Sequence, residues 1–240
     1  MSLRARVFGV FVVGLVVLTT TAMLARLELG LSALYAWKAA SLFVVGAGIA
    51  LGAVQASHPF ARFGSANVVT TARAGVVALV AGLVGESGNS PTVLAAGGSL
   101  ATTLLDGVDG YLARRSRMAS PFGARFDMET DALLILALSV LAWQHGKAGA
   151  WILLAGLLRY LFVAAGWVVP RMRRALPPSR RRQAVCVVQI AGLSLVVLPV
   201  IVQPLSVWIS AVLLAVLVYS FAIDIIWLCR SETAPAIRTR

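Results

Sequence analysis

The chain has 240 residues, of which 60% are hydrophobic and only 12% are charged, and its mean hydropathy is +0.90. Soluble globular domains carry about twice that share of charged residues, so the composition excludes a soluble protein and indicates a polytopic α-helical membrane protein. A net charge of +12 could suit a nucleic-acid-binding protein, but in so apolar a chain we assign it to membrane topology and to contact with anionic lipid head groups, with no nucleic-acid partner.

Apolar runs long enough to cross a bilayer, roughly 20 residues each, follow one another along almost the whole chain. We predict eight spans, at residues 7–25, 33–55, 70–85, 92–113, 127–144, 149–169, 184–202 and 206–228. A break near 57–66 separates the first two spans from the other six. The predicted fold is therefore an all-α membrane bundle, with two N-terminal transmembrane helices (1–60), a six-helix membrane domain (61–230) and a tail (231–240).

Arginines gather at alternate ends of the predicted spans. One set of ends carries Arg4, Arg6, Arg62, Arg114, Arg115, Arg117, Arg125, Arg171, Arg173, Arg174, Arg180, Arg181, Arg182, Arg230, Arg238 and Arg240. The opposite loops carry only Arg26 and Lys147. By the positive-inside rule, both termini and the 114–125 loop face the cytoplasm, which predicts an integral protein of a bacterial-type inner (cytoplasmic) membrane.

Acidic residues are concentrated where two predicted spans meet. Asp106 and Asp109 lie three residues apart on one helix, and Asp127 and Asp131 lie four apart on the next, so each pair occupies one helix face. Because the loop between the helices is short, we expect the four carboxylates to converge in a cleft. Their mutual repulsion is relieved by divalent cations, and an all-oxygen ligand set favours Mg²⁺ or Mn²⁺ over zinc. We therefore expect two ions and a phosphorylated substrate at the cytoplasmic face.

Small residues accompany the aspartates on these faces. Gly110 and Ala113 leave room for a ligand against the helix backbone, although the same residues also suit close packing of membrane helices. Arg114, the next residue, has the length to reach a phosphate or a pyrimidine edge. Gly123 repeats the four-residue spacing of Asp127 and Asp131.

The spacing of all these residues resembles the signature of the CDP-alcohol phosphotransferases, which here reads Asp106-x-x-Asp109-Gly110-x-x-Ala113-Arg114, eight residues, then Gly123-x-x-x-Asp127-x-x-x-Asp131. All eight defining positions are filled, so the match is specific. The motif covers 106–131, and the family's six-helix catalytic core would map onto about 67–228. Enzymes of this family move a phosphoryl-linked group from a CDP-activated donor to an alcohol and release CMP.

The resemblance implies a role for each motif residue. One metal ion would be held by Asp106, Asp109 and Asp127, and the second by Asp106, Asp127 and Asp131. Asp131 would also be the general base for the acceptor hydroxyl. The CDP site would be lined by Gly110, Ala113, Arg114 and Gly123. Upstream, Asn67, Thr70 and Arg73 form an Asn-x-x-Thr-x-x-Arg pattern similar to one in many members, which adds them to the CDP site; an N-cap followed by an interfacial arginine is the alternative.

The acceptor side rests on arginines. Arg159 lies in mid-span, which makes it a functional candidate. The resemblance implies contact with an acceptor phosphate, while the alternative is a buried ion pair with Asp224. The residues Arg180, Arg181 and Arg182 open the seventh span where relatives often have a Gly-Lys-rich sequence, so they are acceptor candidates or purely topological charges.

The resulting hypothesis is Mg²⁺-dependent transfer of a phosphatidyl group, from CDP-diacylglycerol or a similar donor to a small polar alcohol, in phospholipid biosynthesis. Glycerol 3-phosphate, inositol phosphate, serine and a CDP-amino-alcohol reaction with diacylglycerol all remain open, and the arginines favour an anionic acceptor. An aspartate-rich membrane prenyltransferase and a divalent-cation transporter are the alternatives. The resemblance also implies a homodimer, and the role of the two N-terminal helices is open.

Overall fold

The computed structural model describes residues 2–116, 118, 120–174 and 176–230, apart from the side chains of 108, 109 and 111–116. The described residues contain no strand, which confirms the predicted all-α fold. The elements are α1 (Leu3–Leu29), α2 (Leu34–Ser57), α3 (Ser65–Gly82), α4 (Asn89–Ser116), α5 (Pro121–Gln144), η1 (Ala150–Ile152), α6 (Leu153–Val168), η2 (Pro170–Arg173), α7 (Arg180–Val197) and α8 (Leu205–Arg230).

Each predicted span overlaps one α-helix, but the spans 70–85 and 184–202 run past the ends of α3 and α7, and the span 149–169 covers η1 as well as α6. Five segments are long and apolar enough to cross a membrane by length and composition, namely α1, α2, α3, 150–168 and α8. The three helices outside this set, α4, α5 and α7, are those that carry the aspartates or begin with the three consecutive arginines. Much of the outer surface exposes large apolar side chains, such as Val13 and Ile49, as expected for a bundle that faces lipid.

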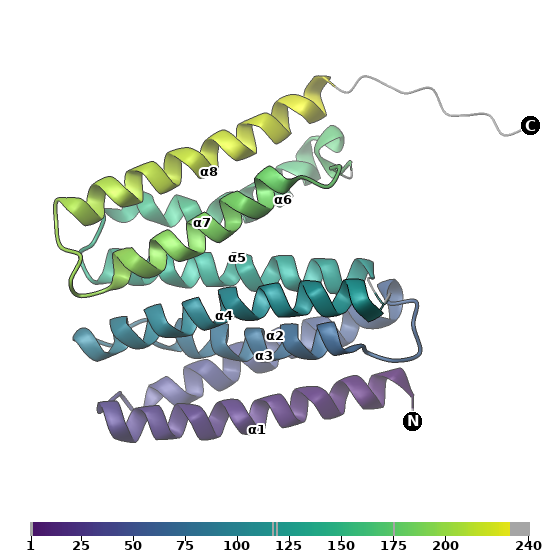
Figure 1. Cartoon of the computed structure of the whole chain (residues 1–240), viewed down its shortest axis with the longest axis horizontal. Coiled ribbons are helices and arrows are strands. Elements are labelled where there is room, and N and C mark those ends of the chain that lie inside the picture. Colours follow the sequence, from purple (N-terminus) through teal and green to yellow (C-terminus); the bar gives the residue numbers. More distant parts are fainter. Residues whose placement is uncertain (1, 117, 119, 175, 231–240) are drawn as a thin grey trace, which may run out of the picture.

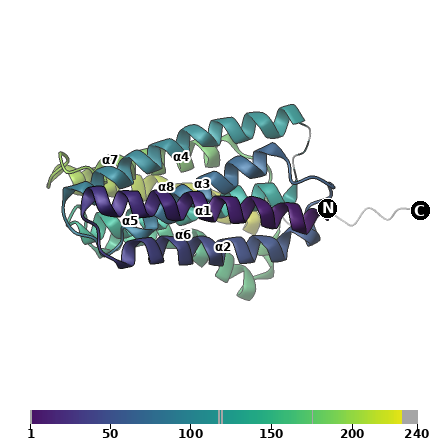
Figure 2. The same ribbon diagram turned by 90° about the horizontal axis from the view of Figure 1, so that it is seen from below.

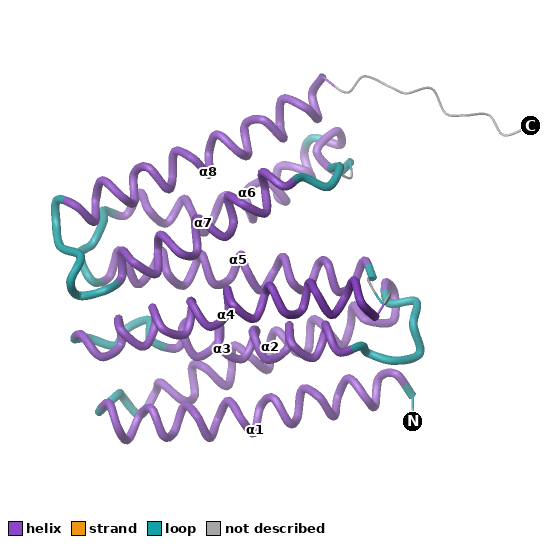
Figure 3. Tube along the Cα trace, in the orientation of Figure 1, coloured by secondary structure: helices purple, strands orange, loops and turns teal. Residues whose placement is uncertain are grey.

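The helices run roughly side by side along the long axis of the molecule, joined by short connections (Figures 1 and 3). Helix α3 packs against α1, α2, α4 and α5, while α7 packs against α4, α5 and α8. The view from below places α1 and α2 on one face of the bundle (Figure 2). The start of α1, the end of α8 and the α2–α3 and α4–α5 connections lie at the same end (Figure 1), which we call the motif end.

Close helix packing holds the core of the bundle together. Leu138 of α5 and Leu193 of α7 are fully buried in one apolar cluster that also includes residues of α3. A Cβ atom added at Gly156 of α6 would lie 2.5 Å from the Cα atom of Leu136 on α5, so only glycine allows this approach of the two backbones. The core therefore fixes α5 against α3, α6 and α7, and α5 is the helix that carries half of the predicted aspartate cluster.

A polar contact joins the N-terminal helices to the core at the end opposite the motif. The Glu86 carboxylate accepts hydrogen bonds from the backbone N–H (2.9 Å) and hydroxyl (2.6 Å) of Ser32, and from the Lys38 ammonium (3.1 Å). Burial acts to raise the pKa of Glu86, but these donors together outweigh it and leave the pKa below its ordinary value. The α1–α2 connection is thus tied to the α3–α4 connection by a charged carboxylate.

Candidate active site

Three of the four predicted aspartates meet at the motif end of the bundle. Helix α5 begins with Ser120 as N-cap, whose hydroxyl oxygen accepts a hydrogen bond from the Gly123 N–H (3.0 Å), and with Pro121 in the first turn. This start places Asp127 and Asp131 one helical turn apart, facing Asp106 on the neighbouring helix α4. One carboxylate oxygen from each of the three lies within 4.8 Å of the others.

The three carboxylates surround the guanidinium group of Arg73, from the middle of α3. Its Nη1 lies 3.0 Å from Oδ1 of Asp106 and also pairs with Asp127, while its Nη2 lies 2.5 Å from Oδ1 of Asp131. The Arg73 side chain is only 1% exposed. Arginine suits this position because its planar group presents several donors in fixed directions and stays charged when buried. The predicted CDP-site residue Arg73 therefore lies in the acidic cluster itself.

The other two residues of the upstream pattern, Asn67 and Thr70, occupy the same face of α3 and are buried. The Asn67 amide donates to the Phe63 carbonyl oxygen (2.5 Å), which fixes its side chain. Its Oδ1 atom lies 2.7 Å from the position that a Cβ atom of Gly123 would occupy. A Cβ atom at Gly123 would displace the Asn67 amide where the start of α5 passes α3, so Asn67 and Gly123 lie side by side, and we call this contact region the surface formed by Asn67 and Gly123.

The remaining motif residues lie on α4. Gly110 is partly exposed on this helix. The side chains of Asp109, Ala113 and Arg114 lie outside the described residues, so their predicted roles stay predictions.

One neighbour of the cluster is absent from the sequence-based prediction. The thiol of Cys186 on α7 lies 3.5 Å from Oδ2 of Asp131, in hydrogen-bonding geometry. Asp131 is thus contacted on both carboxylate oxygens, by Arg73 on one and Cys186 on the other. The only sequence signal for this contact is the position of Cys186, about two turns into α7, and no spacing rule connects it to Asp131.

The structure contradicts the alternative interpretation in which Arg159 pairs with Asp224, while the predicted acceptor role of Arg159 stays a prediction. Arg159 on α6 instead forms an ion pair with Glu129 of α5 and lies 2.7 Å from the sulfur of Met128. Glu129 points away from the Asp127/Asp131 face, so it reaches the adjacent helix α6. A residue two positions from an aspartate of the motif thus neutralises the mid-span arginine.

Asp224 on α8 pairs with two of the three consecutive arginines that open α7. Arg181 pairs with the Asp224 carboxylate and donates to the Ser220 hydroxyl (2.8 Å), while Nη1 of Arg182 lies 3.3 Å from Oδ1 of Asp224. Arg180 is exposed. Arg182 precedes Cys186 by four residues on the same helix, so this basic group lies about one helical turn, 5–6 Å along the axis, from the neighbour of Asp131.

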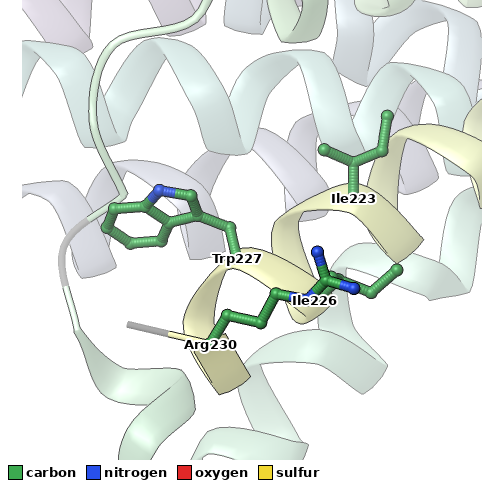
Figure 4. A pocket seen from close by; sticks show the side chains of 4 residues that line it. All are labelled: Ile223, Ile226, Trp227 and Arg230. Atoms are coloured by element: carbon green, nitrogen blue, oxygen red, sulfur yellow. The ribbon is translucent and has the colours of Figure 1, made fainter. Parts of the chain in front are cut away.

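An open hollow of about 460 Å³ at the end of α8 is lined by Ile223, Ile226, Trp227 and Arg230 (Figure 4). None of its lining residues belongs to the acidic cluster or to the predicted motif. This hollow is therefore separate from the site described here.

The donor atoms of the cluster fit a divalent cation. The three described ligands are all carboxylate oxygens, the ligand type that Mg²⁺ and Mn²⁺ prefer. Their separation allows one ion to contact more than one of them. The arrangement can therefore hold a hard cation against a substrate that itself offers oxygen ligands, such as a phosphate.

An acidic centre of carboxylate oxygens in an all-α membrane bundle is compatible with a membrane-embedded enzyme that acts on phosphorylated substrates. The family model for CDP-alcohol phosphatidyltransferase matches residues 63–219, which is more than half of the chain. The chain therefore belongs to the CDP-alcohol phosphatidyltransferase family, whose members transfer substituted phosphate groups. This result confirms the family predicted from the aspartate motif and separates the chain from the prenyltransferase and transporter alternatives.

Comparison with curated proteins and with solved structures gave no significant match for this chain. The matched segment begins just before α3, so α1, α2 and most of the α2–α3 connection lie outside it.

Proposed function

We propose that this protein transfers a phosphatidyl group from CDP-diacylglycerol to the hydroxyl group of a small polar alcohol and releases CMP. The observation that carries the proposal is the convergence of Asp106, Asp127 and Asp131 at one end of the bundle, with ligand oxygens within 4.8 Å of one another. In our proposal this end faces the cytoplasm of a bacterial-type inner membrane, with both termini on that side. Residues 61–230 form the catalytic domain, and a second copy of the chain completes a homodimer.

Two divalent cations, Mg²⁺ or Mn²⁺, are proposed to be held by these aspartates together with Asp109. Asp106 and Asp127 would serve both ions, while Asp109 and Asp131 would each serve one. When bound, the ions supply positive charge that neutralises the donor diphosphate and stabilises the leaving CMP phosphate. The rest of the reaction depends on the side chains of the chain itself.

Asp131 is proposed as the general base. The acceptor oxygen attacks the phosphorus atom that carries the diacylglycerol, a new P–O bond forms there, and the P–O bond to the CMP phosphate breaks. The acceptor proton passes to Asp131, and CMP leaves with the electron pair of the broken bond. Contacts from Arg73 and Cys186 to the two oxygens of Asp131 hold this carboxylate in one orientation, and a general base contributes chiefly through such positioning.

The nucleotide is proposed to lie along the surface that Asn67 and Gly123 form. The other residues proposed for this CDP site are Thr70, Gly110, Ala113 and Arg114. Close approach of a ligand to a helix requires small residues, and a Cβ atom at Gly123 would close the space next to Asn67. Asp127 and Asp131 lie about one and two turns beyond Gly123 on α5. A diphosphate that extends from a cytidine on this surface would therefore reach them.

The acceptor is proposed to bind between Asp131 and the group of Arg181, Arg182 and Asp224. The single carboxylate of Asp224 leaves one positive charge in this group, which favours an acceptor with an anionic substituent. Arg180 can add to this charge from the same turn. Arg159 is the weaker candidate because Glu129 already neutralises it.

The proposal is tested with purified protein in detergent, labelled CDP-diacylglycerol, Mg²⁺ and a panel of acceptors that includes glycerol 3-phosphate, inositol phosphate and serine. We expect CMP release that depends on one acceptor and stops when EDTA removes the metal. The Asp131→Asn variant is the matched control, since it should bind the donor without turnover. Folded protein that releases no CMP with any acceptor would refute the proposed reaction.

A further inference from the structure

The connection between α2 and α3 contains a histidine that is buried at the motif end. His58 is 6% exposed and follows the last residue of α2. It lies outside the segment matched by the family model, which begins at residue 63. Its neighbours in space, however, belong to the start of α5, the helix that carries Gly123, Asp127 and Asp131.

The hydrogen bonds of His58 define which atoms donate. Its Nε2 lies 2.8 Å from the carbonyl oxygen of Arg62, and a carbonyl only accepts, so Nε2 carries the proton. In the neutral ring Nδ1 is then an acceptor, and the Ser120 hydroxyl, 3.0 Å away, donates to it. The same Ser120 oxygen accepts the Gly123 N–H (3.0 Å). His58 therefore orients the hydroxyl group that caps α5.

Aromatic contacts reinforce this connection. The His58 ring lies 5.9 Å from the ring of Phe122 in an edge-to-face arrangement, and Phe122 stacks on Phe126 at 5.7 Å. Phe126, the residue before Asp127, lies 6.3 Å from Phe11 of α1. The first turns of α5 are thus held by both the α2–α3 connection and the first N-terminal helix.

The same α2–α3 connection also fixes Asn67, which forms the α3 side of the proposed nucleotide surface. The Phe63 carbonyl oxygen accepts from the Asn67 amide, and the Phe63 ring lies 6.0 Å from Phe122. Asn67 and Gly123, which lie side by side at that surface, are therefore both attached to the 58–63 segment.

We infer that His58 is a positioning residue through which the two N-terminal helices set the shape of the nucleotide site between α3 and α5. It acts through Ser120 on Gly123 and touches neither substrate nor metal. The inference rests on the proposed function, because it takes the surface formed by Asn67 and Gly123 as the CDP site. It gives the N-terminal helices a specific task in donor binding.

The test is a His58→Phe substitution, which keeps an aromatic ring and removes both hydrogen bonds. Loss of the hydrogen bond that orients the Ser120 cap is expected to weaken CDP binding about three- to tenfold in the presence of Mg²⁺. We expect the KM for the CDP-linked donor to rise by the same factor. The KM for the acceptor and kcat, normalised to the protein that binds CDP, should stay close to wild type. The measurements are calorimetry with CDP and steady-state kinetics on the full-length protein.

Three further variants separate positioning from a general effect on folding. His58→Asn keeps a polar atom near Nδ1 and is expected to recover most of the CDP affinity. His145→Phe, the same change at the other histidine of the chain, lies at the opposite end and should leave CDP binding unchanged. Ser120→Ala combined with His58→Phe should weaken binding no further than Ser120→Ala alone, because both act through one hydroxyl group.

The outcomes distinguish this inference from the proposed function. Wild-type protein that does not bind CDP at all would refute the proposed function. If the wild type binds CDP and the His58→Phe variant binds it equally well, only the inference is overturned. Additive effects of His58→Phe and Ser120→Ala, or a loss of kcat without any change in KM, would also overturn it.

Discussion

Replacement of Arg73 by glutamine gives the most direct test of how the acidic cluster is held together. The Arg73 guanidinium contacts Asp106, Asp127 and Asp131 and is 1% exposed. Arg73→Gln removes this positive charge and leaves three carboxylates near one another. We expect the variant to be destabilised without metal and to depend on a divalent cation for its stability.

The magnitude follows from burial. Removal of one partner of a buried ion pair costs about 3–5 kcal/mol. Asp106 and Asp127 are 36% and 37% exposed, and Asp131 is 17% exposed, so water partly solvates the carboxylates left behind. The lower end, about 3 kcal/mol, is therefore appropriate. For a chain of this length that loss corresponds to a decrease in Tm of roughly 6–12 °C.

The assay is thermal unfolding of detergent-purified protein in EDTA and over a Mg²⁺ titration. Mg²⁺ that binds the folded state raises its stability by an amount that grows with Mg²⁺ affinity and concentration. In the wild type Mg²⁺ competes with the Arg73 guanidinium for the carboxylates, and in the variant it does not. The Mg²⁺-dependent rise in Tm should therefore be larger for Arg73→Gln than for wild type. Arg125→Gln, a change at an exposed arginine of α5, is the matched control. An EDTA melting point equal to wild type, or equal Mg²⁺ shifts in both proteins, would refute the reasoning.

Three other predictions follow from single contacts. Asp131→Asn should lower turnover by about 10²-fold or more while calorimetry shows CDP affinity near wild type, and near-normal turnover would contradict its role as base. Gly123→Ala places a Cβ atom 2.7 Å from Oδ1 of Asn67, so CDP affinity should fall about tenfold and stability by about 1–3 kcal/mol, as measured by calorimetry and melting. Because the pKa of Glu86 is lowered in the folded protein, its contribution to stability exists above its ordinary pKa and is lost as pH falls through the lowered value; Glu86→Gln should flatten the plot of Tm against pH below the ordinary glutamate pKa.

The helices could be predicted from the sequence because membrane spans depend on a local property, the length of an apolar run. Each of the eight predicted spans overlaps one observed α-helix, but the ends differ: some helices extend beyond the apolar run, and α3 and α7 end before the predicted spans do. Helix α1, predicted over 7–25, begins at Leu3 because Ser2 caps it, and it continues to Leu29, where Gly30 ends it in the left-handed conformation. Polar residues in these end turns cost nothing outside the hydrocarbon, so hydropathy alone misses them.

The aspartate cluster could be predicted for a related reason. A spacing of three or four residues on consecutive helices with a short connection leaves few alternatives to a shared face. The partner of Asp224 could not be predicted in this way. Arg159, Arg181 and Arg182 are all within reach of a helix neighbour, and only the rotation of α6 and α7 in the bundle decides between them. That rotation is set by close contacts such as Gly156 against α5, which no charge pattern encodes.

His58 illustrates a second limit of the sequence. A single histidine in a short connection has no periodicity, and its usual interpretation is a solvated loop residue. Its burial depends on the aromatic residues Phe60, Phe63 and Phe122. Two of these precede α3 and the third opens α5, so the contact exists only after both helices are in place.

The balance of charge in each ion-pair group indicates what that group can bind. Among the described residues, the Arg159–Glu129 and Lys38–Glu86 pairs are neutral, so they serve to join helices. The Arg73 cluster has three carboxylates for one guanidinium, and its excess of negative charge attracts a divalent cation. The group of Arg181, Arg182 and Asp224 has the opposite excess, which attracts an anion.

Asp131 belongs to the first of these groups and faces α7, the helix that carries the arginines of the second. Cys186 contacts Asp131, and Arg182 lies one turn before Cys186 on α7, so a basic group lies near the proposed base. A neutral acceptor would leave the arginine charge unmatched in a site that lipid partly surrounds, at a cost that an anionic acceptor avoids. In our proposal α5 and α7, which position Asp131, therefore also favour an acceptor that carries its own negative charge.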